Sequence, residues 1–372
     1  MLRIAPSVTF ILVIAAGAAF VFFNPFSAAT EKPQTPRPPF PYTVEEMKVE
    51  TGGVTLAGTL TLPEGDTPAP AAILLSVAGP NDRDQHFAGH RSFAVMADAL
   101  ARNGVAAARF DDRGAGGSTG DYFEASWETL RDDAVSIYEA ISRDPRIDPA
   151  RIGFIGISEG AAVAAMAVNA IGEARFAILL SAPGLTGRDA LALQLEKTLE
   201  LSGVTGQRAD QYRKLFDDYI DIVASDPASP ETRARLTEFL EGPGAALIPP
   251  YSFVPKTVEG RVEMLLGPWY QSNVHFDPAP VYMAIDTPVL AIGGELDPVA
   301  PPEQHLAAIE NYLARAPGRD VTVRIFPDVN HLMQSAKTGS PAEYAALENT
   351  LSDEVLDAIN GWLGQRIGAQ SE

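Results

Sequence analysis

The chain has 372 residues, of which 46% are hydrophobic and 20% charged, and it contains no cysteine. This composition is typical of a globular protein, and the length suffices for one large domain with an insertion. The formal net charge of −20 opposes binding to nucleic acid or to anionic membrane surfaces. The lack of cysteine excludes disulfides, thiolate metal sites and a cysteine nucleophile.

The N-terminal 29 residues have the pattern of an export segment. Residues 7–23 carry no charge, and Arg3 is the one charged side chain before them. The length of this run suits both a signal peptide, cleaved near Ser27-Ala28-Ala29, and an uncleaved membrane anchor. In either case we expect the rest of the chain outside the cytoplasm, whether periplasmic, secreted or tethered. The proline-rich residues 30–43 predict an extended linker.

From residue 44 onward, short apolar segments alternate with amphipathic ones, which predicts an α/β fold with a doubly wound, mostly parallel sheet. Two lead-in strands, joined by a hairpin turn, and six buried strands are expected at 44–50, 54–62, 71–77, 105–110, 151–157, 176–181, 288–292 and 321–326. Helices are expected at 92–102, 126–142, 161–171, 302–314 and 353–365.

The strand pattern stops between residues 185 and 280. Helical patterns at 189–201, 207–223 and 231–240 precede a stretch rich in proline, glycine and aromatic residues. A structureless loop of this length is improbable inside a compact domain. We therefore expect a mainly helical cap at 185–280, inserted between the two parts of the core, 44–184 and 281–372.

Ser158 lies in the string Gly156-Ile157-Ser158-Glu159-Gly160, between a predicted strand and an alanine-rich helix. This context is the one in which a G-x-S-x-G string forms a sharp turn that exposes a nucleophilic serine. Side chains are poorly tolerated two positions before and two positions after the serine, because the backbone approaches closely there. We therefore predict that Ser158 is the nucleophile of a hydrolase.

A serine nucleophile needs a base and a carboxylate that orients the base. Among the five histidines, His331 follows the last predicted strand, whereas the other four are predicted to be structural or surface residues. Asp297 follows the strand at 288–292, and Glu295 on the same loop is the alternative. The order Ser158, Asp297, His331 is the order that this type of fold uses.

The oxyanion of a tetrahedral intermediate needs two backbone N–H donors. The amide of Glu159 is expected to supply one. The loop after the first core strand should supply the other, and since Pro80 has no N–H, Gly79 is the first candidate and Asn81 the second.

Several segments resemble the EstD-like bacterial carboxylesterases of the α/β-hydrolase superfamily, and the resemblance extends from about residue 44 to residue 363. These segments are Gly79-Pro80-Asn81-Asp82-Arg83-Asp84, residues 109–120, the Ser-Glu-Gly turn, Asn330-His331-Leu332-Met333-Gln334, Thr338-Gly339 and Glu343-Tyr344. The chain departs from the family in Ile157, where histidine is usual, and in Val77-Ala78-Gly79, where serine or glycine is commoner.

The resemblance implies an α/β-hydrolase fold with a small helical cap and a Ser158–His331–Asp297 esterase acting on short acyl esters. No cofactor or metal is implied, and a small-molecule ester is the expected partner. Within this framework, Asp111-Asp112-Arg113 is predicted to brace the loops around the site, and Glu159 is expected to pair with Arg83 or Arg113.

The same three side chains would also serve a serine aminopeptidase or a thioester hydrolase, because all of these reactions are acyl transfers. Export argues against thioesters of coenzyme A, which is a cytoplasmic metabolite. A third alternative is a non-catalytic binding protein on a hydrolase scaffold, which the ordered Ser, Asp and His disfavour. The sequence leaves the oligomeric state open.

Overall fold

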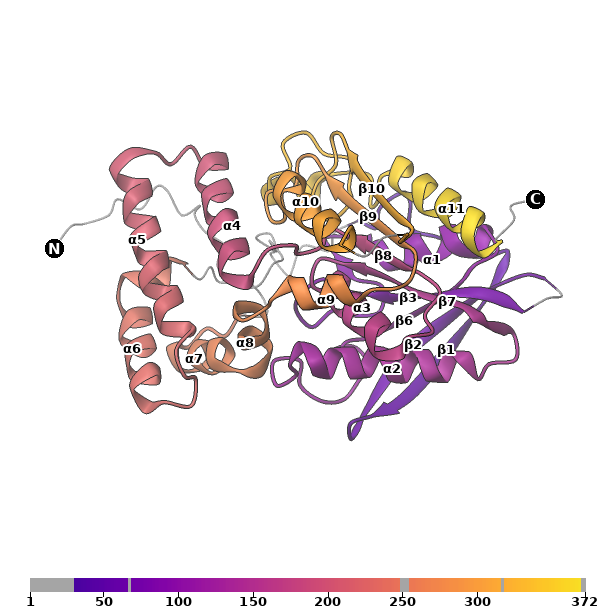
Figure 1. Cartoon of the computed structure of the whole chain (residues 1–372), viewed down its shortest axis with the longest axis horizontal. Helices are drawn as coiled ribbons and strands as arrows, with labels where there is room; N and C mark the ends of the chain where they lie inside the picture. The colour runs from indigo at the N-terminus through magenta and orange to yellow at the C-terminus, as the bar shows by residue number, and fades with distance from the viewer. Residues whose placement is uncertain (1–29, 66–67, 248–253, 316–317, 369–372) are drawn as a thin grey trace.

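A computed structural model describes residues 30–65, 68–247, 254–315 and 318–368 (Figure 1). Its core is one eight-stranded sheet in the order β1-β2-β6-β3-β7-β8-β9-β10. The strands are β1 (Tyr42–Thr51), β2 (Val54–Pro63), β3 (Ala69–Leu75), β6 (Ala106–Phe110), β7 (Ile147–Ile157), β8 (Ala177–Leu180), β9 (Val289–Gly294) and β10 (Val321–Phe326). β2 runs antiparallel to both β1 and β6, and the strands from β6 to β10 are parallel. The predicted doubly wound, mostly parallel sheet is confirmed.

The two faces of the sheet are covered by helices, as an apolar parallel sheet requires. The packing pairs α1 with α11 on one face, and α2, α3, α9 and α10 form a continuous layer on the other. Their bounds are α1 (Ser92–Arg102), α2 (Trp127–Ser142), α3 (Glu159–Ile171), α9 (Pro278–Ala284), α10 (Pro302–Leu313) and α11 (Asp353–Ile367). Every core helix expected from the sequence is present, whereas the short helix α9 was missed.

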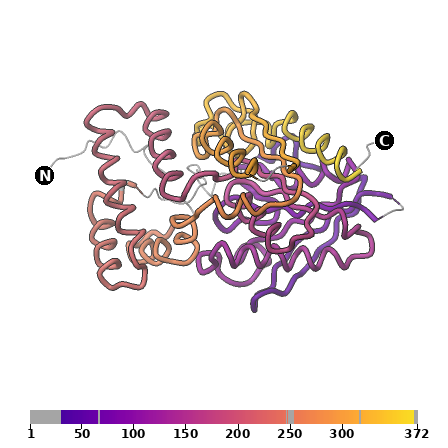
Figure 2. Tube along the Cα trace, viewed as in Figure 1, coloured from indigo at the N-terminus to yellow at the C-terminus, as the bar shows by residue number. Residues whose placement is uncertain are grey.

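The interval between β8 and β9 holds the inserted helices, which stand beside the core as a separate block (Figures 1 and 2). These are α4 (Gly187–Leu201), α5 (Gly206–Val223), α6 (Pro230–Glu241), η1 (Pro243–Leu247), α7 (Val258–Leu266) and α8 (Pro268–Val274). The three expected cap helices correspond to α4, α5 and α6. The pattern of the proline- and glycine-rich stretch did not reveal α7 and α8, because each is under ten residues long.

A two-stranded hairpin, β4 (His86–Phe87) and β5 (His90–Arg91), also went unpredicted. The segment expected to be an extended linker lies against the core instead. Lys32 Nζ donates to the carbonyl oxygens of Ala345 and Leu347, and Gln34 Nε2 donates to that of Leu351.

None of the helices within the described ranges is long and apolar enough to cross a membrane. The predicted export segment, residues 1–29, lies outside those ranges.

Candidate active site

Ser158 occupies a strained turn between β7 and α3. Its φ of 56° and ψ of −119° place a non-glycine residue in a conformation that costs free energy and persists only where surrounding structure holds it. A Cβ at Gly156 would lie 2.1 Å from the carbonyl oxygen of Gly160, and a Cβ at Gly160 would lie 2.2 Å from that of Leu75. Both glycines are therefore required by close backbone contacts, as the sequence predicted.

The structure brings the three candidate side chains into one hydrogen-bonded line. His331 Nε2 lies 3.0 Å from Ser158 Oγ, and His331 Nδ1 lies 2.9 and 2.8 Å from the two carboxylate oxygens of Asp297. All three are buried, with exposed fractions of 4% for Ser158, 1% for His331 and 3% for Asp297. They come from the carboxyl ends of β7, β9 and β10, which lie at one edge of the sheet (Figure 1).

The Asp297 carboxylate is held by the backbone as well as by His331. Its Oδ1 accepts from the amides of Val299 and Ala300 at 2.8 and 2.9 Å. Burial by itself raises the pKa of this carboxyl, but the charge and hydrogen bond of His331, with the Ala300 amide, hold the pKa below its usual value. Asp297 is therefore positioned to accept from Nδ1, whereas the alternative, Glu295, is exposed.

The loop that carries His331 is fixed by its neighbour. The buried Asn330 accepts, through Oδ1, from the amides of Leu332 and Gln334, each at 3.0 Å. Ser181 Oγ donates to the carbonyl oxygen of His331 at 3.0 Å. These contacts set the direction of the imidazole without touching it.

The predicted oxyanion loop differs from expectation. The amide of Gly79 donates to Tyr122 Oη at 3.1 Å, and the amide of Asn81 donates to Asp112 Oδ2 at 2.9 Å. Gly79 is therefore not a free donor, and this assignment is corrected. The amide of Ala78, a residue that is buried at the start of this turn, donates to no acceptor among the described residues.

The amide of Glu159 opens α3, where the first N–H groups have no partner within the helix. Its role as an oxyanion donor stays a prediction. Nothing in the sequence distinguished Ala78 from Gly79, because the choice depends on the distant Tyr122.

Among the described residues, no arginine is hydrogen-bonded to the Glu159 side chain, contrary to expectation. Its Oε1 accepts from Tyr122 Oη, and its Oε2 accepts from Trp127 Nε1 at 2.9 Å and Trp269 Nε1 at 3.0 Å. Burial raises the pKa of Glu159 to about 7, although the three donors oppose the rise. Because Trp269 belongs to α8, this carboxyl joins the cap to the turn that carries Ser158.

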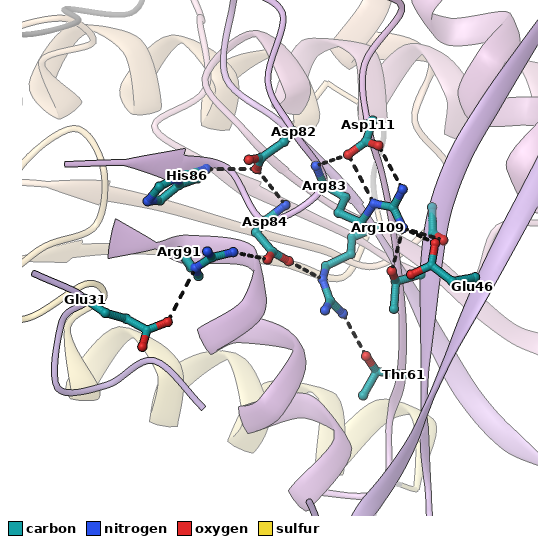
Figure 3. Close-up of polar contacts among 12 residues, drawn as sticks. Glu31, Glu46, Thr61, Asp82, Arg83, Asp84, His86, Arg91, Arg109 and Asp111 are labelled. Carbon is teal, nitrogen blue, oxygen red and sulfur yellow. Dashed lines mark hydrogen bonds and ion pairs between the residues drawn. The ribbon is translucent and has the colours of Figure 1, made fainter. Parts of the chain in front are cut away.

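The arginines of this region brace the loop after β3, as Figure 3 shows. Arg83 binds Asp111 through its backbone amide at 2.7 Å and its guanidinium at 2.8 Å, and it also contacts Glu46 at 2.6 Å. Asp84 accepts from Arg109 Nε at 2.9 Å. The bracing role predicted for this region is thus seen, with Arg83 as its centre.

Arg113 has a different partner from the one expected. Its guanidinium binds Asp133 of α2 at 2.6 and 2.7 Å, not Glu159. Asp112 instead accepts from Ser76 Oγ at 2.8 Å and from the Asn81 amide. Burial, together with the nearby charge of Glu159, raises the pKa of Asp112 to about 7.

A small cavity adjoins Ser158 and His331 and encloses about 40 Å³. It is walled by the cap helix α4, by α10, and by the segments between them. Most of the lining is apolar, and the residues other than Ser158 and His331 are Trp127, Glu159, Ser181, Pro183, Leu185, Gly187, Ala190, Leu191, Gln194, Asn273, Phe276, Val299, Ala300 and His305.

Three of the other four histidines have the structural or surface positions predicted for them. His86 and His275 are exposed, and His90 is buried against Thr350 and the carbonyl oxygen of Tyr344. His305, expected to have a structural or surface role, lines the cavity beside Ser158. Among the described residues, no group of three or more His, Asp or Glu side chains is arranged to hold a metal ion.

Comparison with known proteins gives a consistent result. The profile of the serine aminopeptidase family S33 matches residues 88–229, which contain Ser158 and end before Asp297 and His331. Esterase EstD of Thermotoga maritima is 26% identical over 330 residues, which cover 87% of this chain and 68% of the esterase.

Solved structures share the architecture. A Pyrococcus furiosus esterase superposes with a TM-score of 0.52 at 18% identity, covering 88% of this chain and 92% of its own. Est1E of Butyrivibrio proteoclasticus, determined with ferulic acid, gives a TM-score of 0.53 at 15% identity over 87% and 99% of the two chains. The chain has the α/β-hydrolase fold and is similar in sequence to esterase EstD. The fold and family resemblance expected from the sequence are confirmed, and a serine hydrolase activity is supported.

Proposed function

We propose that this α/β-hydrolase is a carboxylesterase that works through an acyl-enzyme on Ser158. The observation that carries the proposal is the line from Ser158 Oγ through His331 to Asp297, with distances of 2.8 to 3.0 Å. Such a line lets imidazole remove the serine proton while the carboxylate stabilises the imidazolium that forms.

In the first half-reaction, Ser158 Oγ attacks the ester carbonyl carbon while its proton passes to His331 Nε2. The oxyanion that develops is stabilised by the backbone amides of Ala78 and Glu159. Collapse breaks the bond to the alcohol oxygen, which receives the proton from His331. Water then repeats the sequence on the acyl-enzyme, releasing the carboxylic acid and restoring the Ser158 hydroxyl.

The size of the cavity supports short acyl groups. A water molecule needs roughly 10–15 Å³ of such space, so the cavity of about 40 Å³ accommodates only a few non-hydrogen atoms. The apolar lining favours an alkyl chain over a charged group. We expect the kcat/KM for p-nitrophenyl esters to be highest at two to four acyl carbons and to fall with longer chains.

Covalent labelling with a fluorophosphonate tests the nucleophile. The protein should gain one adduct on Ser158, and Ser158→Ala should gain none and lose hydrolysis while keeping its circular dichroism spectrum. A folded wild-type protein that forms no adduct would overturn the proposed function and would favour a non-catalytic role.

A serine aminopeptidase is the second candidate because of the family whose profile matches. Such an enzyme needs a carboxylate to bind the substrate's amine. The carboxyl in the cavity wall, Glu159, is already engaged by three donors. Amino-acid p-nitroanilides assayed beside the esters decide between them, and faster anilide turnover would replace the esterase proposal.

We also propose that the protein is exported, on the basis of the uncharged run at residues 7–23. Mass measurement of the protein from a membrane and a soluble fraction distinguishes a chain that begins near Thr30 from one that keeps its N-terminal segment. Recovery of the intact chain from the cytoplasm alone would contradict export.

A further inference from the structure

Two polar side chains in the cavity beside Ser158 are not used by the proposed chemistry. Gln194 extends from the cap helix α4, and His305 extends from the core helix α10. Their exposed fractions are 3% and 1%. Both line the same cavity as Ser158 and His331, Gln194 from the cap and His305 from the core.

The hydrogen bonding of His305 fixes which of its nitrogens carries a proton. Nδ1 accepts from the amide of Gly184 at 3.0 Å, so in the neutral ring the proton is on Nε2. Burial lowers the pKa of His305 to about 4, which keeps the ring neutral at physiological pH. The close approach of Gly184, where a Cβ would lie 2.1 Å from the His305 carbonyl oxygen, holds this arrangement.

The Nε2 atoms of these two side chains suggest that the cavity binds a ligand. Neither His305 Nε2 nor Gln194 Nε2 has a hydrogen-bond partner among the described residues, although both atoms are buried. Buried donors are normally paired, because an unpaired one loses its hydration without compensation. Both residues line the cavity that holds the nucleophile, so a substrate that enters the cavity can supply the missing partner.

The chemistry of the pair restricts that atom. Both groups donate, so the substrate must supply an acceptor. Both are uncharged, and the described residues that line the cavity include no lysine or arginine. A carboxylate or phosphate would have to lose its hydration without meeting a positive charge, which is unfavourable. A neutral oxygen, as in an ether, hydroxyl or carbonyl group, is an acceptor that suits such donors.

We propose that Gln194 and His305 form a specificity subsite that hydrogen-bonds a neutral oxygen of the ester substrate, in addition to the ester group itself. The inference rests on the proposed esterase function and narrows its substrate class to small esters that carry a further ether, hydroxyl or carbonyl oxygen. That oxygen belongs to the acyl part or to the alcohol part, and both locations present the same chemistry to the two donors.

The test uses pairs of esters that differ only by oxygen in place of methylene. On the acyl side the pair is p-nitrophenyl methoxyacetate and p-nitrophenyl butyrate, and on the alcohol side it is 2-methoxyethyl acetate and butyl acetate. For each pair the ratio of kcat/KM values is compared between wild type and variants, so the intrinsic reactivity of the esters cancels.

The variants remove one donor each from different helices. Gln194→Met keeps the length of the side chain, and His305→Asn retains an acceptor for the Gly184 amide. Each should lower the oxygen-to-methylene ratio about tenfold in at least one pair, the value expected for one lost hydrogen bond. The pair that responds shows which part of the substrate carries the oxygen.

Leu191→Met, on α4 and in the same cavity, is the matched control and should leave both ratios unchanged. Fluorophosphonate titration of Ser158 measures the active fraction of each variant. Unchanged ratios in Gln194→Met and His305→Asn, with active enzyme present, would overturn the subsite and leave the esterase proposal standing. Failure of wild type to hydrolyse any of the four esters would instead count against the proposed function.

Discussion

Replacement of Glu159 by glutamine should make the protein more stable at alkaline pH. This carboxyl is buried beside the nucleophile, and burial raises its pKa from 4.5 to about 7. Glutamine matches the protonated carboxyl in shape, with one acceptor and one donating end, but it cannot ionise. The variant therefore reproduces the protonated form of the wild-type side chain at every pH.

The magnitude follows from linkage. Because the folded-state pKa lies above the unfolded-state value, the contribution of Glu159 to stability is fully present below pH 4.5 and is lost as pH rises through 7. A rise of roughly 2.5 pKa units corresponds to about 3 kcal/mol. Glu159→Gln should thus match wild type near pH 4.5 and exceed it by about 3 kcal/mol in free energy of unfolding at pH 8.

Urea unfolding of both proteins, followed by tryptophan fluorescence at several pH values between 4.5 and 8, measures this difference. The pKa of Asp112 is also raised to about 7, in part by the charge of Glu159, so it should fall in Glu159→Gln and add to the stability that the variant gains at pH 8. Glu295→Gln, at an exposed position, is the control and should follow wild type within about 0.5 kcal/mol. Parallel curves for wild type and Glu159→Gln would refute the reasoning.

Three other substitutions probe the geometry of the site. Gly160→Ala places a Cβ 2.2 Å from the Leu75 carbonyl oxygen. This clash should displace the turn that carries Ser158 and lower kcat on the order of 100-fold. A near-normal kcat in ester assays would contradict this. Tyr122→Phe leaves the Gly79 amide unpaired and should cost about 1–3 kcal/mol in urea unfolding, and an unchanged midpoint would disprove the contact. Asp297→Asn should lower kcat about 10⁴-fold with the fold intact by circular dichroism, and a loss under tenfold would exclude it as the orienting carboxylate.

The sequence by itself determined the strands of the main sheet, the long helices and the identity of the three central side chains. Strands buried on both faces give continuous apolar runs, and the glycines around Ser158 mark a turn that few other residues permit. Asp297 and His331 could be chosen because the carboxyl ends of parallel strands gather at one edge, so position along the chain implies position in space. These are local signals, or signals that follow directly from strand order.

Tertiary structure decided which groups contact one another across long distances. Glu159 meets Trp127 and Trp269 rather than an arginine, because a cap helix that lies 110 residues later packs over the turn. Tyr122 accepts the hydrogen bond of the Gly79 amide, whereas the amide of Ala78 has no acceptor among the described residues. The local sequence of the loop did not predict this difference.

The residues that line the cavity could not be predicted from the sequence either. His305 has the pattern of an ordinary core-facing helix residue, and Gln194 that of a polar cap residue. Only the packing of α4 against the core brings their unpaired donors to the wall beside Ser158. Substrate selection depends on surfaces assembled from segments that are distant in the sequence. A strand, a turn and the order of three residues can be predicted from the local sequence.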